Sequence, residues 1–158
     1  MRNRIDSIRF ENGSQSGAPA VSMRLSSFAD YAVVLMSAAA RHCGAARMNA
    51  TTLAAETGIP LPTAQKLVSR LSAAGLLESS RGTGGGVRLS RPPATITLAD
   101  VVEAVEGPIA MTACSEQGAH DCLLEQDCRV RPHMNMANNA IREALAGVTI
   151  ASLTREMA

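Results

Sequence analysis

The chain has 158 residues, which is enough for one compact domain with extensions but not for two full domains. Apolar residues make up 46% of the chain, but only one Tyr and two Phe are present, so the core must be built from aliphatic side chains. Such a core suits packed helices better than a β-sandwich. Neither a secretory signal nor an apolar run long enough to cross a bilayer is found, so we expect a cytoplasmic protein with reduced thiols.

The net charge of +1 is unevenly distributed along the chain. Residues 59–91 contain five Lys or Arg and one Glu, a net charge of +4. Residues 98–128 contain seven Asp or Glu and neither Lys nor Arg, a net charge of −7. The first stretch therefore suits a polyanionic partner such as DNA, and the second does not.

Residues 1–22 are rich in Ser, Gly and Asn and lack helical periodicity, so we interpret them as a disordered leader. A first domain is expected over residues 23–107. Its first helix is predicted over residues 27–42, because Ser27 and Asp30 resemble a capping box and apolar residues then recur at helical spacing.

A short second helix is predicted over residues 49–57, and a third follows a proline-containing turn from about residue 62 to 74. One face of the third helix is apolar, and the other carries polar and basic side chains: Thr63, Gln65, Lys66, Ser69 and Arg70. Two helices joined in this way form the helix-turn-helix pattern of DNA-binding proteins. Two surface helices of an ordinary bundle would give the same pattern.

Two short strand-like runs, residues 76–80 and 87–90, flank a glycine-rich tip. The tip and its flanks contain Arg81, Gly82, Gly84, Gly85, Gly86 and Arg88. Glycine permits positive φ and close backbone approach, so we expect a basic hairpin wing beside the third helix. A phosphate-binding nucleotide loop fits less well, because such a loop leads into a helix and ends in Lys-Ser or Lys-Thr.

Thr97 and Asp100 form a second capping-box pattern, which predicts a fourth helix ending at Gly107. A cysteine-rich loop is expected over residues 108–131, and a dimerisation helix with its tail over residues 132–158. The last helix has a narrow apolar stripe, formed by Ala137, Ile141, Ala144, Leu145 and Val148. Such a stripe packs either on a second copy, which gives a homodimer, or on its own domain.

Three of the four cysteines, Cys114, Cys122 and Cys128, lie in this loop. Thiolates are soft ligands that suit iron–sulfur clusters, zinc or copper(I). The gaps are wider than the spacing of about two to four residues usual in structural zinc sites, and no Cys-x-x-Cys redox pair is present. A zinc-stabilised interaction domain, a thiol-redox protein and unliganded core thiols remain as alternatives.

Longer stretches of the sequence match a known pattern. They are MRLSSFADYAV at 23–33, GIPLPTAQKLVSRLSAAGLLESSRGTGGGVRLSRP at 58–92, and EGPIAMTAC at 106–114, followed by two more cysteines. Together they resemble the Rrf-two family of iron–sulfur winged-helix transcriptional regulators, over residues 23 to about 155. The chain is most similar to the branch that regulates the SUF system of iron–sulfur assembly, and is also similar to the Isc regulator and the nitric-oxide-sensing repressor.

The resemblance implies a homodimer that binds a palindromic operator in double-stranded DNA. It also implies an iron–sulfur cluster, of the two-iron or four-iron type, held by Cys114, Cys122 and Cys128. The implied DNA contacts come from the third helix and the wing: Lys66 and Arg70 as phosphate or guanine contacts, Gln65 and Thr63 as base readers, with Ser69 and residues 81–86 beside them.

The fourth cluster ligand is open. The Isc regulator has a histidine shortly after its third cysteine, where this chain has Arg131 and, two residues further on, His133. The nitric-oxide sensor has a first-helix aspartate that matches Asp30. The Isc regulator also has a glutamate where this chain has Gln65.

The sequence thus predicts a mainly α-helical, winged helix-turn-helix repressor without enzymatic activity. It is expected to sense iron–sulfur cluster status and to control assembly genes of the SUF or Isc type. An iron- or nitric-oxide-responsive repressor of the same fold is the main alternative.

Overall fold

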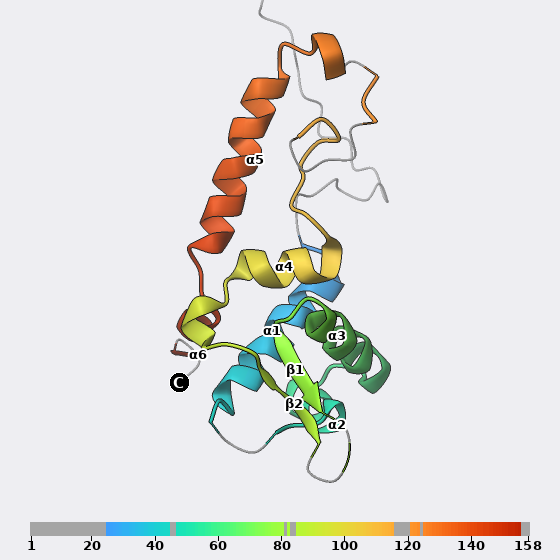
Figure 1. Ribbon diagram of the computed structural model, residues 1–158, viewed down its shortest axis with the longest axis vertical. Coiled ribbons are helices and arrows are strands. Elements are labelled where there is room, and N and C mark those ends of the chain that lie inside the picture. The colour runs from blue at the N-terminus through green and yellow to red at the C-terminus, as the bar shows by residue number, and fades with distance from the viewer. Residues whose placement is uncertain are drawn as a thin grey trace, which may run out of the picture.

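The computed structural model describes residues 25–44, 47–80, 82, 85–115, 121–123 and 125–155. This part of the chain is mainly helical, with one two-stranded hairpin (Figure 1). Its elements are α1 (Ser27–Arg41), α2 (Ala50–Thr57), α3 (Leu61–Ala73), β1 (Leu77–Ser80), β2 (Gly86–Leu89), the short 3-10 helix η1 (Pro93–Thr95), α4 (Leu98–Glu106), the 3-10 helix η2 (Glu125–Asp127), α5 (Arg131–Ala146) and α6 (Ile150–Arg155).

The central helix of the core is α1. Its residues from Leu35 to Ala40 are all buried, and α2, α3, α4 and α6 all contact it. The capping box predicted at Ser27 and Asp30 is wrong by one residue. Ser26 is the N-cap, because its backbone is extended and its hydroxyl accepts a hydrogen bond from the amide of Ala29.

The helix-turn-helix pair consists of α2 and α3. The side chain of Asn49 caps α2 by accepting a hydrogen bond from the amide of Thr52 at 2.7 Å. Gly58 ends this helix in the left-handed region, with a φ of 72°. The predicted apolar stripe of α3 is confirmed, since Leu67 and Leu71 are fully buried and the opposite face is exposed.

The hairpin follows α3 directly, with β1 and β2 antiparallel and Leu77 paired with Leu89. In the half of the hairpin nearer its tip, Val87 forms a bridge with Met48. Gly86 is needed for this close approach, because it has a φ of 150° and a Cβ there would lie 2.6 Å from the carbonyl oxygen of Met48. A role in the fold is thereby established for Gly86.

Two features of the C-terminal region differ in how well the sequence predicted them. The capping box of α4 is confirmed, with the Thr97 hydroxyl accepting from the amide of Asp100 at 3.1 Å and the Asp100 carboxylate accepting from the amide of Thr97 at 2.9 Å. The short helix α6, by contrast, was not expected. Val148 lies beyond the end of α5 and is not part of its stripe, because its carbonyl pairs with the amide of Leu98.

The head is formed by α1–α4, the hairpin and α6. Ile150 of α6 is fully buried, so the chain returns to the head after α5. Figure 1 shows α5 projecting away from the head, with α4 crossing its base. The described residues 108–115 of the cysteine segment, which spans residues 108–130, lie beside α5. None of the described helices is long and apolar enough to cross a membrane.

Candidate DNA interface and candidate metal centre

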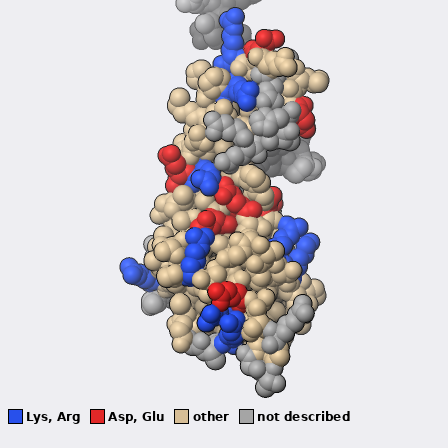
Figure 2. All heavy atoms as spheres, viewed as in Figure 1, with Lys and Arg blue, Asp and Glu red and all other residues tan. Residues whose placement is uncertain are grey.

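The outer face of α3 is the candidate reading surface. Gln65, Lys66, Ser69 and Arg70 are exposed, and Thr63 is half-buried. Figure 2 shows Lys and Arg side chains on the flanks and lower end of the head, and several Asp and Glu side chains across the middle of the molecule. Further groups of both signs lie at the upper end, and Arg88 pairs with Glu78 and Arg142 with Glu103, so the two signs of charge are mixed on this face.

The two cations of α3 are directed toward α1. The ammonium of Lys66 lies 5.4 Å from the ring centroid of Phe28, and the guanidinium of Arg70 lies 5.3 Å from it. Arg70 also donates a hydrogen bond to the carbonyl oxygen of Val105, in the last turn of α4. Arg70 thus has partners within the head.

The polar side chains of the same face are differently placed. Within the described part of the chain, Gln65 and Ser69 have no side-chain hydrogen bond. Their donors and acceptors are therefore available to base edges or phosphates.

The wing is partly described. The amide of Gly85 donates to the carbonyl of Gly82 at 2.8 Å, which closes a turn at the tip. On the strands, Arg88 forms an ion pair with Glu78 at 2.7 Å. The predicted contacts Arg81 and Gly84 lie outside the described residues.

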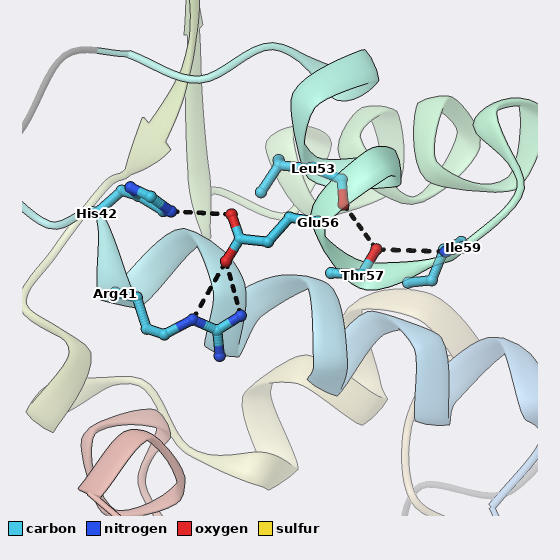
Figure 3. A network of polar contacts seen from close by, with 6 residues as sticks. All are labelled: Arg41, His42, Leu53, Glu56, Thr57 and Ile59. Carbon is cyan, nitrogen blue, oxygen red and sulfur yellow. Dashed lines mark hydrogen bonds and ion pairs between the residues drawn. The ribbon is translucent and has the colours of Figure 1, made fainter. Parts of the chain in front are cut away.

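A polar network joins the end of α1 to α2 (Figure 3). Glu56 accepts from Arg41 at 2.7 Å and lies 2.9 Å from the imidazole of His42. The hydrogen bonds from Arg41, aided by His42, hold the pKa of Glu56 below its ordinary value of 4.5. The contacts of Glu56 with Arg41 and His42 fix the first helix of the helix-turn-helix pair on α1. The hydroxyl of Thr57, the next residue, donates to the Leu53 carbonyl at 2.6 Å within α2.

The candidate metal centre is the cysteine segment between α4 and α5. Cys114 is buried, whereas Cys122 and Cys128 are half-buried. The Cys114 sulfur lies 3.6 Å from the hydroxyl of Thr112. A tight turn holds the backbone here, since the amide and hydroxyl of Ser115 both donate to the carbonyl of Thr112, at 3.1 and 2.9 Å.

Arg131 connects the two ends of this segment. Its guanidinium donates to the carbonyl of Cys114 at 3.1 Å, and its backbone amide donates to the carbonyl of Cys128 at 3.2 Å. The side chain and the backbone of one residue thereby contact the backbones of the first and third cysteines. In the sequence, Arg131 stands out only because the Isc regulator has a histidine near this position.

A complete metal site is not assembled in the described part of the chain, which contains no group of three or more His, Cys, Asp or Glu positioned to hold an ion. Asp30 is exposed in the first turn of α1, and His133 is exposed in the first turn of α5. The donor set nevertheless fits a soft metal centre in its chemistry, because three thiols lie on one short segment and Arg131 links two of their backbones.

A family model described as an iron-dependent transcriptional regulator, Rrf2, matches residues 25–156. The chain belongs to the Rrf2 family. It is therefore a helix-turn-helix transcriptional regulator and not an enzyme, as the sequence predicted.

Relatives of this Rrf2 protein differ in how much of their length they share with it. The protein aau3 of Rhizobium meliloti is 44% identical over 90 residues, which cover 57% of this chain and 58% of that protein. The transcriptional regulator NsrR of Geobacillus kaustophilus is 28% identical over 136 residues, 86% of this chain and 92% of that one.

Solved structures of related regulators confirm the winged-helix fold. CymR, the global cysteine regulator of B. subtilis, matches with a TM-score of 0.67 at 26% identity, over 85% of this chain and 98% of its own. IscR of T. potens matches with a TM-score of 0.64 at 24% identity, over 89% of this chain and 92% of its own. The hairpin of this Rrf2 protein is thus the wing of that fold.

Several contacts of this Rrf2 protein could not be recognised from the sequence. Asn138 is buried on α5, and its side-chain oxygen accepts from the amide of Met111 at 2.9 Å. Arg142 of α5 pairs with Glu103 of α4 at 2.8 Å, and this hydrogen bond raises the pKa of Arg142. In the sequence, only the position of polar Asn138 beside an apolar stripe could have indicated that it is buried. No pattern of neighbouring residues could have indicated the ion pair between Arg142 and Glu103, because it joins two separate helices.

Proposed function

We propose that this Rrf2 protein is a cytoplasmic, homodimeric repressor that senses iron–sulfur cluster status and controls iron–sulfur assembly genes of the SUF or Isc type. Cys114, Cys122 and Cys128 would hold the cluster, whether of the two-iron or the four-iron type. The observation that carries the proposal is the position of these thiols, on one segment that joins the head to α5, with Arg131 contacting both its first and its third cysteine.

Two further observations support this assignment. The family model is described as iron-dependent, which fits a thiolate-rich metal centre. Residues 98–128, which include α4 and most of the cysteine segment, carry a net charge of −7. This environment destabilises lone thiolates, and a cationic metal centre would offset it. When bound, the cluster would supply a cross-link through three thiolates within the segment.

DNA reading is assigned to the exposed face of α3. Gln65, Ser69 and Thr63 are the proposed base-edge contacts, because their polar groups are not engaged by a neighbouring helix. Lys66 is the proposed phosphate contact. The wing would approach the sugar–phosphate backbone of the DNA through Gly82 and Gly85. Arg81 and Gly84, which lie outside the described residues, are proposed to contact it as well.

Dimerisation is assigned to α5 because most of its apolar surface is not covered. Met136 is 70% exposed, and Asn138 is the one fully buried side chain of the helix. Ile141 and Leu145 line an apolar groove of about 600 Å³ together with Val102 of α4. A second copy packed on this surface would provide the twofold symmetry that a palindromic operator requires.

Nitric oxide is a second candidate signal, favoured by the similarity to NsrR across most of both chains. The two candidate fourth ligands belong to this question. Asp30, in α1, would reach the cluster of the partner subunit, whereas His133, in α5, would serve its own. Replacing each by Ala and recording the visible absorption of the cluster separates these assignments.

The test of the proposal is anaerobic purification followed by iron, sulfide and visible-absorption analysis. We expect the full chain to be coloured and to contain iron and sulfide, and the Cys122→Ala variant to lose most of both. Cys43→Ala is the matched control, because Cys43 is exposed at the end of α1, outside the segment. An unchanged iron content in Cys122→Ala, or colourless protein with stoichiometric zinc, would contradict the proposal.

A further inference from the structure

The last turn of α4 is a junction between the recognition helix and the cysteine segment. Three consecutive residues form it: Val105, Glu106 and Gly107. The carbonyl of Val105 accepts from the guanidinium of Arg70 on α3, and the carboxylate of Glu106 accepts from the hydroxyl of Ser26, the N-cap of α1. Gly107, with a φ of 92°, turns the chain out of the helix and into the cysteine segment.

Arg70 occupies a position at this junction that suits a permanent internal contact. The last four carbonyls of a helix have no partner within that helix, and cations are favoured near them. The Arg70 guanidinium is both a hydrogen-bond donor to the Val105 carbonyl and a cation at this helix end. The centroid of the Phe28 ring lies 5.3 Å from the same guanidinium. A side chain held in this way is poorly placed to contact a phosphate as well.

We propose that Arg70 is a positioning residue that couples the cysteine segment to the recognition helix, and not a DNA contact. A displacement of the segment would shift the end of α4, and the bond to Val105 would carry that shift to α3. This inference rests on the proposed function, because it requires two states of the segment that differ in DNA affinity.

Lys66 is the matched comparison for Arg70. It lies on the same helix and over the same ring, with its ammonium 5.4 Å from the centroid, but it makes no hydrogen bond to α4 in the described structure. A cation that contacts phosphate releases counterions, so its removal lowers the salt dependence of DNA binding by about one unit of slope. A positioning residue leaves this slope unchanged.

The experiment measures affinity for a DNA duplex, enriched by the protein itself from a random library, at several salt concentrations. Two forms are compared: protein purified anaerobically, and a variant with Cys114, Cys122 and Cys128 all replaced by Ala. Arg70→Ala, Arg70→Met and Lys66→Ala are each placed in both forms. Arg70→Met keeps an unbranched stem against Phe28, which guards against a misfolded Ala variant, and circular dichroism checks the fold.

We expect both Arg70 variants to keep the salt slope of the protein that retains Arg70. In that protein, the affinities of the two forms for the duplex should differ by about tenfold, and in the Arg70 variants this ratio should fall to about one. Lys66→Ala should lower the slope and keep the ratio. A slope lowered in the Arg70 variants by about one unit per subunit, or about two for the dimer, overturns the inference, and so does a ratio that they leave unaltered.

Failure of the proposed function is recognised in the protein that keeps Arg70. If its two forms bind the duplex equally, sensing through the cysteines is wrong, and the coupling is overturned with it. The salt slope of the Arg70 variants still decides whether this side chain contacts phosphate.

Discussion

The head and the cysteine segment with α5 are stabilised in different ways. In the head, side chains such as Leu35, Leu53 and Leu67 are fully buried, and side chains cap α1, α2 and α4. In residues 108–115, 121–123 and 126–146, the buried residues are Cys114, Ser115 and Asn138. The head therefore has its own apolar core, whereas the rest depends on polar contacts and, in our account, on a second copy and a cofactor.

The largest expected effect tests the core of the head. Leu67→Ala should lower the free energy of unfolding by about 2–5 kcal/mol, because it opens a cavity between α3 and its neighbours. Met136→Ala, on the proposed dimer surface of α5 and outside the core of the head, should change the free energy of unfolding of the head by less than about 0.5 kcal/mol. Chemical denaturation monitored by circular dichroism compares the two variants. Equal losses would contradict the distinction between the two regions.

The next effect concerns the surface of α5. Ile141→Asp should yield monomers and weaken binding to a palindromic duplex by about a hundredfold, since two linked heads bind more tightly than one. Sedimentation and DNA titration measure the two changes. The head should unfold at a nearly unchanged denaturant concentration. An intact dimer in this variant would remove α5 as the interface.

A smaller effect is expected where the two regions meet. Thr97→Ala removes one half of the capping box of α4 and should cost about 1 kcal/mol of stability. Thr97→Ser, which keeps the hydroxyl, is the control. Thermal unfolding of both variants gives the comparison, and an Ala variant as stable as the Ser variant would argue against the cap.

The smallest effect is an ion pair within the head. Glu56→Gln should cost about 0.5 kcal/mol at neutral pH, because the pair is solvent-exposed. The folded-state pKa of Glu56 lies below its ordinary 4.5, so its stabilising contribution is present above that value and fades as the pH falls through the folded-state pKa. Denaturation of both proteins at neutral and acidic pH should show the difference shrinking. If the difference in free energy of unfolding between the two proteins grew on acidification, the predicted direction of the pKa shift of Glu56 would be wrong.

Signals close together in the sequence predicted the fold of the head well. The pattern Thr97-x-x-Asp100 and the glycine at 58 specify helix ends through neighbours, and the structure confirms both. Ser26 and Ser27 are chemically equal as caps, so only the backbone conformation, which is extended at Ser26, shows which of them is the N-cap. The helix α6 is short, and the burial of Ile150 depends on distant residues, so periodicity could not reveal it.

The candidate site was less predictable, because its contacts join residues far apart in the chain. The sequence placed Arg70 on a polar outer face, but its bond to Val105 spans 35 positions. The link from Arg131 to Cys114 spans 17 positions. The three thiols were recognised from ligand chemistry, spacing and the family resemblance, and their joint role as cluster ligands stays a prediction.

The measurement that tests the central claim most directly is the affinity of the anaerobic, iron-containing protein for its enriched duplex, before and after removal of the metal with a chelator at constant salt. We predict that the two dissociation constants differ by a factor of about 5 to 150. Identical constants at every protein concentration would contradict the claim that the state of the cysteine segment controls the head.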